Sequence, residues 1–514
     1  MVNRVKTGTV VGINAYEVSV ETDVVNSLPG MSIVGLPDTS VNEARDRVKS
    51  AIKNSGYSLP SKKIVINLAP ADLKKVGTSF DLPIAVGILV EEDVIDWEKL
   101  KDYAFIGELS LDGLIRGVNG VLPLVLGLKE AGVTNIIVPK ANVKEAALID
   151  GVNIYGAEHL TDVVNHFIET QIQPTKIDIT KYLAEKTQQN YNFDFKDVKG
   201  QQKAKKALEI AAAGGHNLLM IGSPGSGKTL MAKCFASILP PLELSEALEL
   251  TKIYSICGLL TEDEPLMSKR PYRAVHHTAS ANGIIGGGTT PKPGEITLAH
   301  RGVLFLDEMV EFPRQVLEVL RQPLEDGEIV ISRAKHSIKY PAKFMLLGAM
   351  NPCPCGFLGD KEKQCSCSDF QISRYLAKLS GPLLDRIDLQ VDVPRLTPQE
   401  LLNANNEEES SETIRKRVIK ARQIQLERYK NESILTNAEL TSELIKKYCP
   451  IDEKSREILK VAIVKYQLSG RRYDRILKLA RTIADLDNSK DIQQIHLMQA
   501  LQYRMFNPEE YGKN

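Results

Sequence analysis

The sequence has no net charge, since 65 lysine and arginine residues balance 65 aspartate and glutamate residues. A chain-wide basic surface for nucleic acid is therefore excluded, and any basic patch must be local. The chain also lacks an apolar run approaching the ~20 residues that a membrane span needs. Its first residues, "MVNRVKTGTVVGINAYEVSVETDVV", show neither the apolar segment nor the cleavage site of a signal peptide. We therefore expect no membrane association.

Cysteine is scarce and unevenly placed. The seven cysteines are odd in number and mostly clustered, which is not the pattern of a secreted disulfide framework. We therefore expect a cytoplasmic protein. Hydrophobic residues make up 43% and charged residues 25% of the chain, as in ordinary soluble globular proteins. A length of 514 residues predicts roughly three domains, each large enough to bury a core.

Residues 1–170 alternate short strands and helices. Alternating β-branched residues predict strands at "TGTVVGI", "YEVSVETDV" and "KKIVINL", and we expect further strands at "YAFIGEL" and "NIIVP". A helix is predicted at "SVNEARDRVKSAIKNSG", with Ser40 as its candidate cap and Gly56 as its stop, and another at "GVLPLVLGLKEAG". Together these elements predict a compact α/β or α+β domain.

Polar stretches divide the rest of the chain. Residues 171–193 are polar and predict a linker. Residues 194–402 contain the strongest motifs and predict a second α/β unit. Residues 403–413, "NANNEEESSET", predict an acidic loop. Over residues 414–514, apolar positions at three- and four-residue spacing predict a mostly helical domain.

The strongest motif is a glycine-rich phosphate loop. In "HNLLMIGSPGSGKTLMAK", an apolar strand at 218–221 runs into the pattern G-x-x-x-x-G-K-T, which opens an apolar helix. The glycines let backbone N–H groups turn toward nucleotide phosphates, and the helix N-terminus adds its dipole. Lys228 would neutralise phosphate charge, and the Thr229 hydroxyl would ligate Mg²⁺. The alternative, a glycine-rich turn with a chance lysine, does not account for the strand, loop and helix together.

Two acidic residues follow a second apolar strand. The stretch "GVLFLDEM" ends this strand in Asp307 and Glu308. A carboxylate at the strand tip would hold Mg²⁺ opposite Thr229, and the next one would polarise a water for attack on the γ-phosphate. A strand ending in two acids is usually only a solvated strand end, but its position downstream of a phosphate loop favours the catalytic interpretation.

Three further polar residues are candidates for the same site. The stretch "KFMLLGAMN" predicts a buried strand ending at Asn351, whose side chain would orient the attacking water. Arg386, in "SGPLLDRIDL", is expected in an exposed turn next to acids, either as a structural ion pair or as an arginine finger that reaches a neighbouring subunit's nucleotide. Arg471 begins the late helix "SGRRYDRILKLARTIADL" and is a second candidate for a γ-phosphate contact.

The order of these motifs resembles that of the AAA+ ATPases. The long stretch "RPYRAVHHTASANGIIGGGTTPKPGEITLAHRGVLFLDE" resembles the magnesium-chelatase-like branch and, within it, the ComM/YifB family, which is linked to DNA branch migration in transformation and recombination. The stretches "SIVGLPDTSVNEARDRVKSAIKNSGY", "INLAPADL" and "FDLPIAVGIL" match the family's N-terminal domain, and "GQQKAKKALEIAAAGGHNLL" its nucleotide-entry segment. The resemblance covers nearly the whole chain.

The resemblance implies an α/β fold and assigns the site. It implies an AAA+ P-loop core, with a parallel sheet and flanking helices, followed by a helical C-terminal lid. By this resemblance Walker B consists of Asp307 and Glu308, the first sensor is Asn351, the finger is Arg386 and the second sensor is Arg471. Val198 and Gly200 would lie near the adenine. Walker A is then made of Gly222, Ser223, Pro224, Gly225, Ser226, Gly227, Lys228 and Thr229.

The resemblance also implies an assembly and a substrate. The family implies a homo-oligomeric ring, a hexamer, that uses ATP and Mg²⁺ and acts on single-stranded or branched DNA. The segment between Ile284 and Gly294, with three consecutive glycines and two prolines, resembles the loop that such rings direct into their central channel. An ordinary surface loop is the alternative, because the segment has no basic or aromatic cluster.

The N-terminal domain resembles the proteolytic domain of Lon, an α+β, ribosomal-protein-like fold. The stretch "FIGELSLDGLIRGVNGVLPLVLGLKEAGVTNIIVPKAN" parallels the segment that supplies Lon's catalytic lysine, but Leu122 occupies the lysine position. Ser79 falls where the nucleophile would be, and a serine without a partner base is a weak nucleophile. Lys129 lies about two helical turns downstream and would not substitute. We therefore expect an inactive domain that binds DNA or scaffolds the ring.

The cysteine cluster is a candidate metal site. Within "NPCPCGFLGDKEKQCSC", four thiolates would form a closed tetrahedral Zn²⁺ site on a loop that leaves the ATPase sheet, namely Cys353, Cys355, Cys365 and Cys367. Free thiols that pack in a core are the alternative, although "KEKQCSCSD" is polar for a core. Cys234, Cys257 and Cys449 are expected to be isolated structural residues. His276 and His277 have no third metal ligand nearby and are expected to be structural.

The sequence thus predicts an ATPase and leaves its substrate open. The leading reading is a hexameric ATP-driven DNA helicase or translocase that promotes branch migration. One alternative is a motor for metal insertion, like the ATPase subunit of magnesium chelatase, which however lacks a Lon-like domain in front. Another is an assembly factor in which ATP binding only switches a ring that recruits partners. The assignment of DNA as the substrate rests on family analogy, because fold does not fix function.

Overall fold

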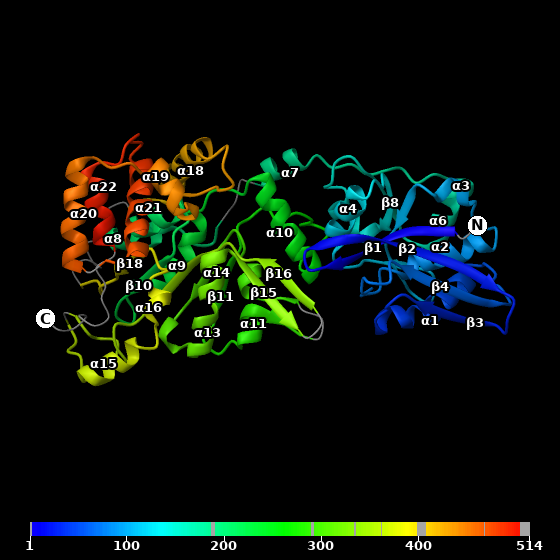
Figure 1. Ribbon diagram of the computed structural model, residues 1–514, viewed down its shortest axis with the longest axis horizontal. Coiled ribbons are helices and arrows are strands. Elements are labelled where there is room, and N and C mark those ends of the chain that lie inside the picture. Colours follow the sequence, from blue (N-terminus) through cyan, green and yellow to red (C-terminus); the bar gives the residue numbers. More distant parts are fainter. Residues whose placement is uncertain are drawn as a thin grey trace. The chain divides into compact units, whose positions relative to one another are not determined.

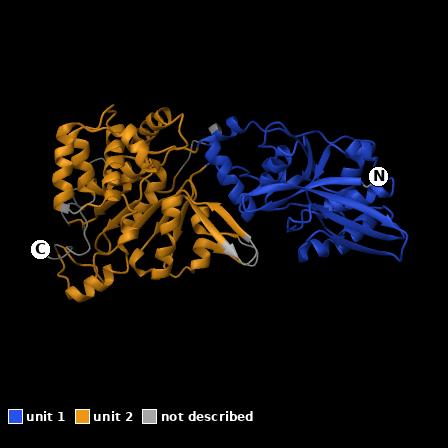
Figure 2. Ribbon diagram, viewed as in Figure 1, with its two compact units in different colours: residues 1–188, 243–268 blue, residues 189–242, 269–514 orange. Residues whose placement is uncertain are grey.

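The chain forms two compact units, shown in different colours in Figure 2. The computed structural model describes residues 3–186, 191–288, 292–333, 336–360, 362–397, 408–466 and 468–503. Unit 1 comprises Met1–Gln188 and Glu243–Ser268, and unit 2 comprises Gln189–Leu242 and Lys269–Asn514. Residues 243–268, which the sequence analysis places within the ATPase domain, therefore group with the N-terminal unit. No helix in the described ranges is both long and apolar enough to cross a bilayer.

A seven-stranded mixed sheet forms the centre of unit 1 (Figure 1). Its spatial order is β3-β4-β2-β1-β5-β8-β9, in which β4, β2 and β1 are antiparallel neighbours and the other pairs are parallel. The strands are β1 (Asn3–Val11), β2 (Asn14–Val25), β3 (Gly30–Val34), β4 (Lys63–Ala69), β5 (Tyr103–Phe105), β8 (Asn135–Pro139) and β9 (Asn153–Ala157).

One predicted strand of unit 1 is in fact two. The stretch "YAFIGEL" divides into β5 and β6 (Glu108–Leu109), and β6 pairs with β7 (Ile115–Arg116) apart from the main sheet. The division occurs at Gly107, whose N–H donates to the Ser79 carbonyl at 3.2 Å. The backbone of Gly107 is therefore bonded to the segment before α2 rather than to a neighbouring strand.

The two helices predicted in unit 1 are present as α1 and α4, with one correction at a cap, and six further helices accompany them in the described ranges. The helices of this unit are α1 (Thr39–Asn54), α2 (Asp81–Glu91), α3 (Trp97–Leu100), α4 (Val121–Glu130), α5 (Val143–Ala146), α6 (Leu160–Ile168), α7 (Ile179–Lys186) and α10 (Leu244–Cys257). The cap of α1 is Asp38 instead of Ser40, because the Asp38 carboxylate accepts from the Val41 N–H at 2.9 Å. Helix α7 lies within the segment predicted as a linker.

Helices cover both faces of this sheet. Successive side chains of a strand point to opposite faces, so Ala15 and Thr22 of β2 lie on different sides. Helix α4 packs on the Ala15 side so closely that an added Cβ on Gly127 would lie 2.3 Å from the Ala15 carbonyl oxygen. Helix α2 packs on the other side, where a Cβ on Gly87 would lie 2.5 Å from the Thr22 hydroxyl. Glycine is needed at both positions, because a larger side chain would push the helix away from the sheet.

A five-stranded parallel sheet forms the centre of unit 2 (Figure 1). The spatial order is β11-β14-β17-β10-β18, and the strands are β10 (Leu218–Ile221), β11 (Tyr272–Val275), β14 (Val303–Leu306), β17 (Met345–Met350) and β18 (Leu389–Asp392). The three central strands are buried along their whole length, which explains their uninterrupted apolar sequences. Because β10 lies between β17 and β18, polar residues that follow these strands meet at one edge.

Helices and two hairpins complete unit 2. Around the sheet lie α8 (Gln202–Gly214), α9 (Lys228–Phe235), α11 (Ala281–Ile285), α12 (Glu295–Leu298), α13 (Arg314–Val319), α14 (Arg321–Asp326), α15 (Asp369–Leu376) and α16 (Gly381–Leu384). The hairpins pair β12 (Gly286–Gly287) with β13 (Lys292–Pro293), and β15 (Glu328–Arg333) with β16 (His336–Pro341).

The C-terminal region is helical, as the sequence predicts. It contains α18 (Ser411–Arg428), α19 (Ser442–Tyr448), α20 (Glu453–Tyr466), α21 (Gly470–Leu486) and α22 (Gln494–Gln502). Helices α18 and α21 both pack on α8, and a single hydrophobic core runs from the sheet into these helices. This packing fixes the start of α21 beside the residues that follow α16.

Candidate nucleotide-hydrolysis site

The phosphate loop connects β10 to α9 and depends on its glycines. At Gly222, an added Cβ would lie 2.0 Å from the Val393 carbonyl oxygen, so the end of β18 leaves no room for a side chain. Gly225 and Gly227 adopt φ angles of +77° and +91°, which are strained for other residues. The loop therefore takes the shape in which its N–H groups surround an anion at the N-terminus of α9.

Lys228, the first residue of α9, points into this loop. Its Nζ lies 2.7 Å from the Gly222 carbonyl oxygen and 2.9 Å from that of Ser223. The Asn351 side-chain oxygen, from the end of β17, lies 3.4 Å away. Burial lowers the pKa of Lys228 to about 8, although the two acidic residues after β14 oppose this shift. The ammonium is thus held beside both the loop and the neighbouring strand tip.

Thr229 and Asp307 form the pair expected to hold Mg²⁺. The Thr229 hydroxyl donates to an Asp307 carboxylate oxygen at 2.8 Å, which joins the start of α9 to the end of β14. A hydroxyl and a carboxylate are the hard oxygen ligands that Mg²⁺ prefers, usually together with substrate phosphates and water. The donor set therefore fits the ion, since the site supplies two protein oxygens and opens toward the phosphate loop.

Glu308, the candidate general base, has a strained backbone and an unexpected neighbour. Its φ angle is +50°, an uncommon value for a residue other than glycine. The exposed carboxylate lies 3.5 Å from Nδ1 of His277, which follows β11. The His276 ring stacks on His277 at 4.1 Å, and its own Nδ1 lies 3.0 Å from the Thr278 hydroxyl. His277 thus faces the site, a role that the sequence analysis missed although the residue stands at a strand tip.

Arg386 and Arg471 lie together, and Arg386 is buried rather than exposed. The Arg386 guanidinium forms an ion pair with Glu325 and donates to the Pro382 carbonyl at 2.7 Å. The expectation of an exposed turn was wrong because this ion pair and α16 cover the side chain, which is 6% exposed. The Arg471 guanidinium lies 3.1 Å from the same Glu325 carboxylate. Burial and the neighbouring arginines, Arg471 first, lower the pKa of Arg386.

The segment expected near the adenine is held by charged side chains. Lys205 pairs with Glu408 at 2.6 Å and also donates to the Val198 carbonyl. The Glu408 carboxylate accepts from the Gly200 N–H at 2.7 Å. The next residue, Gln201, donates to the Pro394 carbonyl at 2.6 Å, just after β18. This segment therefore lies at the same edge of the sheet as the phosphate loop.

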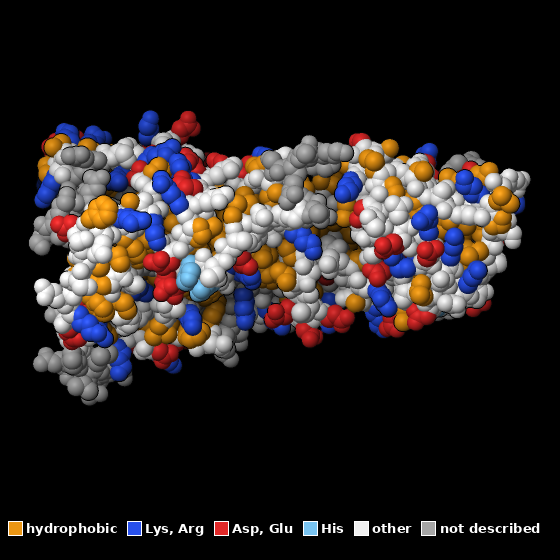
Figure 3. All heavy atoms as spheres, turned by 90° about the horizontal axis from the view of Figure 1, so that it is seen from below, with side chains coloured by type: hydrophobic (Ala, Val, Ile, Leu, Met, Phe, Trp, Pro, Cys, Tyr) orange, Lys and Arg blue, Asp and Glu red, His pale blue; other side chains and the backbone are white. Residues whose placement is uncertain are grey.

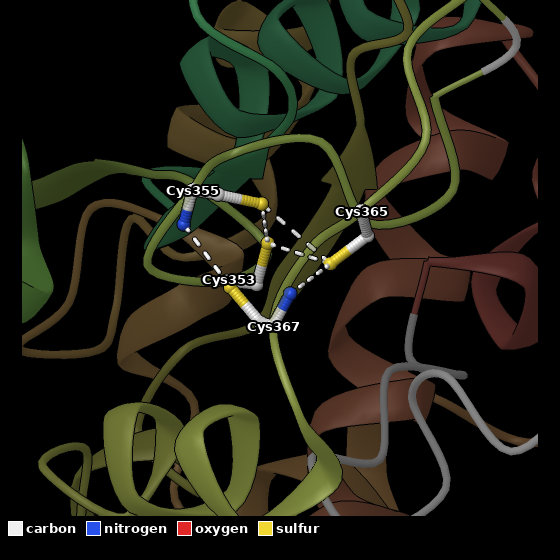
Figure 4. Close-up of side chains that lie close together, drawn as sticks. All are labelled: Cys353, Cys355, Cys365 and Cys367. Carbon is white, nitrogen blue, oxygen red and sulfur yellow. Dashed lines mark hydrogen bonds between the residues drawn. The ribbon is translucent and has the colours of Figure 1, made fainter.

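The four clustered cysteines lie in the loop that leaves β17 and converge on one point (Figure 4). Their sulfur atoms all lie within 4.8 Å of one another, and among the described residues no other group of cysteine, histidine and acidic side chains is so placed. Cys234 and Cys449 are buried and Cys257 is half-buried, each without a disulfide. The cluster is the candidate metal centre, whereas His276 and His277 do not take part in it.

Unit 1 places the Lon-like residues as follows. Ser79 is 8% exposed and lies just before α2. Leu122 is fully buried in the first turn of α4, where its N–H donates to Glu145 at 2.8 Å. The Lys129 ammonium donates to the Asp150 carbonyl at 2.6 Å. Lys129, the only basic side chain among these three positions, is therefore hydrogen-bonded to the loop before β9.

The glycine-rich segment expected to face a channel is only partly described. Gly286 and Gly287 pair with Lys292 and Pro293 as a short hairpin, and residues 289–291 lie outside the described ranges. Ile284, at its base, is buried. Residues 403–407 of the expected acidic loop also lie outside the described ranges.

Three family models match successive parts of the chain. The model "Magnesium chelatase, subunit ChlI" matches residues 194–401, which contain the whole phosphate site apart from Arg471. The model "Subunit ChlI of Mg-chelatase" matches residues 20–142 in unit 1. The model "Magnesium chelatase, subunit ChlI C-terminal" matches residues 408–504.

Relatives match almost the full length. Competence protein ComM of Haemophilus influenzae is 45% identical over 496 residues, which cover 96% of this chain and 95% of the relative. Protein YifB of Escherichia coli is 43% identical over 97% of this chain and 96% of its own length. A magnesium-chelatase subunit ChlI homolog of Methanocaldococcus jannaschii is 24% identical over 63% of this chain and 89% of its own length.

Proposed function

The chain belongs to the ComM/YifB family of magnesium-chelatase-like AAA+ ATPases, and on this premise we propose that it is a hexameric motor that uses ATP hydrolysis to move on DNA. The observation that carries the hydrolysis step is the meeting of three strand ends at the phosphate loop. Lys228 reaches Asn351 of β17, and Thr229 bonds Asp307 of β14. The DNA step rests on the name of the ComM relative and on the family resemblance.

The chain's own residues define the hydrolysis mechanism. Mg²⁺ held by Thr229 and Asp307 would neutralise charge on the β- and γ-phosphate oxygens. Glu308 would accept a proton from the attacking water, and Asn351 would hold that water in line with the γ-phosphate. Lys228 would turn from the loop carbonyls to the phosphates, where its charge is stabilised by the anion.

Arg386 and Arg471 would act together on the nucleotide of a neighbouring subunit. Both guanidinium groups contact the Glu325 carboxylate, so a phosphate that replaces this carboxylate would meet both at once. Two arginines on one phosphate stabilise charge that develops during transfer. The proposal therefore assigns the finger and the second sensor to the same nucleotide, and hydrolysis then requires a ring.

DNA would be bound by local surfaces. On the face shown in Figure 3, lysine and arginine side chains are interspersed with aspartate and glutamate, as zero net charge predicts. Phosphate contacts would then come from a few residues that converge only in a ring, with the Ile284–Gly294 segment as the candidate channel loop. Branch migration in recombination and natural transformation is the activity we propose.

A second candidate function is metal insertion into a porphyrin. All three family models bear the name of a magnesium chelatase subunit. The relative from Methanocaldococcus jannaschii, however, covers only 63% of this chain, whereas the ComM and YifB relatives also cover the N-terminal unit. An assembly factor switched by ATP binding is the third candidate, and low turnover that DNA does not change would favour it.

The remaining assignments complete the proposal. We assign residues 1–170 to a Lon-like domain without peptidase activity, 194–402 to the ATPase domain and 414–514 to the helical lid, with a linker at 171–193 and an acidic loop at 403–413. The four clustered cysteines would bind one structural Zn²⁺. A site that needs ATP and reduced thiols points to the cytoplasm.

The test is steady-state ATP hydrolysis by the purified chain at fixed salt, without DNA and with single-stranded, duplex and four-way-junction DNA. We expect the strongest stimulation with branched DNA. Hydrolysis that no DNA changes would leave the ATPase in place and reject the DNA motor in favour of the other two candidates. Lys228→Ala and Glu308→Gln should both abolish turnover, and normal turnover in both would reject the ATPase assignment.

A further inference from the structure

The knuckle, defined here as residues 353–360 and 362–367, gathers four cysteine sulfur atoms within 4.8 Å of one another, as a tetrahedral metal site requires. Three of its sulfur–sulfur distances are 3.4 Å for Cys353–Cys355, 3.6 Å for Cys353–Cys365 and 3.6 Å for Cys355–Cys365. Four sulfurs placed about 2.3 Å from one Zn²⁺ at tetrahedral angles are about 3.8 Å apart. In Figure 4 these three sulfurs point toward one another, with Cys367 beside the Cys355 backbone nitrogen.

Backbone N–H groups surround these sulfurs. The Cys355 N–H donates to the Cys367 sulfur at 3.4 Å, and the Cys367 N–H donates to the Cys365 sulfur at 3.4 Å. N–H donors stabilise negative charge on sulfur, and the thiolate is the form that binds metal.

The knuckle also packs directly on the phosphate loop. A Cβ added to Gly356 would lie 2.6 Å from Pro224 Cδ and 3.7 Å from the Asn351 side chain. Gly356 has a φ angle of +83°, so the knuckle reaches this position only with a glycine. Cys353 itself follows Asn351 by two residues, and Asn351 contacts the Lys228 ammonium at 3.4 Å.

A second contact lies on the other side of the loop. The Ser223 hydroxyl of the phosphate loop faces the Asp360 carboxyl and, with the backbone amides of Glu362 and Lys363, lowers the pKa of that carboxyl. Those amides lie 2.9 Å and 3.0 Å from Asp360 Oδ1. Asp360 therefore ties the turn between the two cysteine pairs to the loop that would bind phosphate.

We propose that the metal-bound knuckle braces the phosphate loop, so that occupancy of the four-cysteine site controls nucleotide affinity. The inference rests on the proposed Zn²⁺ and ATP sites and adds a coupling between them. With metal bound, the knuckle holds Gly356 against Pro224, and Asp360 against Ser223. Without metal, the four cysteines are protonated to thiols that no common ligand holds together, so the knuckle opens and the loop loses both contacts.

The four-cysteine site is reachable from solution. A surface cavity of about 600 Å³ is lined by Pro354, Cys355, Ser366, Cys367, Gln371, Arg374, Tyr375 and Lys378. Two of the four ligand residues therefore border the cavity, next to two basic side chains of α15 and the turn after it. A thiol reagent combined with a chelator would reach them in the folded protein.

The first experiment uses the full chain and measures metal and nucleotide separately. Metal content is measured by mass spectrometry, and binding of a fluorescent ATP analogue is measured before and after metal is removed with a mercurial reagent and EDTA, followed by dithiothreitol. We expect one zinc per chain, and we expect removal to weaken binding by at least about fivefold, the effect of losing one net hydrogen bond to the loop. Added zinc should restore it.

The possible outcomes test the metal site, the coupling and the ATPase assignment separately. Metal content well below one per chain would overturn the metal site. Full zinc content with affinity unchanged by its removal would overturn the coupling. Zinc-bound protein that binds no nucleotide would overturn the ATPase assignment and the coupling with it. The Cys257→Ser protein is the thiol control, and it should keep both metal and affinity because Cys257 lies outside the cluster.

A second variant tests the coupling without touching the ligands. Asp360→Ala should keep one zinc per chain yet weaken nucleotide binding several-fold, because it removes the carboxyl that faces Ser223. Glu362→Ala is the matched control from the same turn, since its carboxylate faces Arg395 at 3.8 Å. Equal nucleotide affinity in the two variants, with zinc retained in both, would contradict the brace.

Discussion

Burial and phosphate binding would have opposite effects on the pKa of Lys228. Burial lowers its pKa to about 8, from an ordinary value of 10.5, and phosphate would raise it again. Nucleotide binding should therefore take up a proton above pH 8. We expect affinity to be level below this pH and to fall by up to about tenfold per pH unit above it. Calorimetry in buffers of different ionisation enthalpy measures the proton count.

The control for this prediction is Lys228→Met, which removes the titrating group. This variant should bind nucleotide more weakly than the wild type. Its binding should take up no proton between pH 8 and 10.5, which are the lowered and the ordinary pKa of Lys228. Wild-type binding that releases a proton in this range, or that shows no pH dependence, would contradict the role assigned to the lysine.

His277 is expected to position Glu308. Its ring nitrogen lies 3.5 Å from the carboxylate, on the side of the strand tip opposite Asn351 in the sheet order β11-β14-β17. Removing this contact with His277→Ala should lower kcat by about fivefold to tenfold, because the Glu308 carboxylate loses its polar neighbour, and leave KM for ATP nearly unchanged. Steady-state kinetics separate the two parameters.

Two further variants distinguish positioning from a general loss of structure. His277→Gln keeps a side-chain donor and should recover part of kcat. His276→Ala removes the neighbouring ring, which bonds Thr278 rather than Glu308, and should have a smaller effect. An equal loss in all three variants would show that the histidines serve packing only.

At the scale of elements, a buried ion pair joins the start of β18 to α21. Asp388 forms an ion pair with Arg475, and its carboxylate accepts from the Asn217 N–H at 3.0 Å. Burial alone would raise the pKa of Asp388, but the charge of Arg475 and the neighbouring His216 ring lower it below the ordinary 3.8. The ion pair therefore stabilises the fold fully above the ordinary aspartate pKa of 3.8. This stabilisation is lost as the pH falls through the lowered pKa of Asp388.

Asp388→Asn should destabilise unit 2 by about 3 kcal/mol, because it removes the buried charge that pairs with the half-buried Arg475 and accepts from the Asn217 N–H. The measurement is the shift of the unfolding midpoint in urea at neutral pH. Asp385→Asn is the matched control three residues earlier, since Asp385 pairs with Arg472 at 2.9 Å nearer the surface. That variant should lose less than about 1 kcal/mol. Equal losses would contradict the assignment of the buried pair.

The sequence predicted the elements whose signal is local. The apolar strands before Gly222 and Asp307, and the loop between β10 and α9, are written in consecutive residues, so their types and order could be read directly. The cysteine cluster was visible for the same reason. Its sulfur atoms do converge, although the sequence alone could not show that Gly356 lies against Pro224.

Features that depend on distant partners were not predictable. Arg386 was expected in an exposed turn next to acids, yet Glu325 from α14 covers it. Nothing in the sequence marks Glu325 among the chain's many acids. The grouping of residues 243–268 with unit 1 likewise arises from packing of α10 on α4, which has no signature in either segment.

At the scale of the whole molecule, the phosphate loop and the two candidate arginines have separate partners among the described residues. Lys228 and Thr229 are engaged with Asn351 and Asp307, whereas Arg386 and Arg471 gather at Glu325. The proposed ring would resolve this division, because each interface would bring one chain's loop to the next chain's arginines. If the loop and the arginines of one site come from different chains, a mixing experiment can test this in a ring of any size.

Two inactive variants should restore each other when mixed. Lys228→Ala lacks the phosphate lysine but keeps its arginines, and Arg386→Ala has the opposite defect. If Arg386 acts across the interface, a random mixed ring has about one quarter of its interfaces formed by an intact loop and an intact arginine. ATPase activity of the mixture should then rise to about that fraction of wild type, after subunits exchange. Mixtures that stay as inactive as their components would place Arg386 and Lys228 in the same chain's site, and the finger assignment would be wrong.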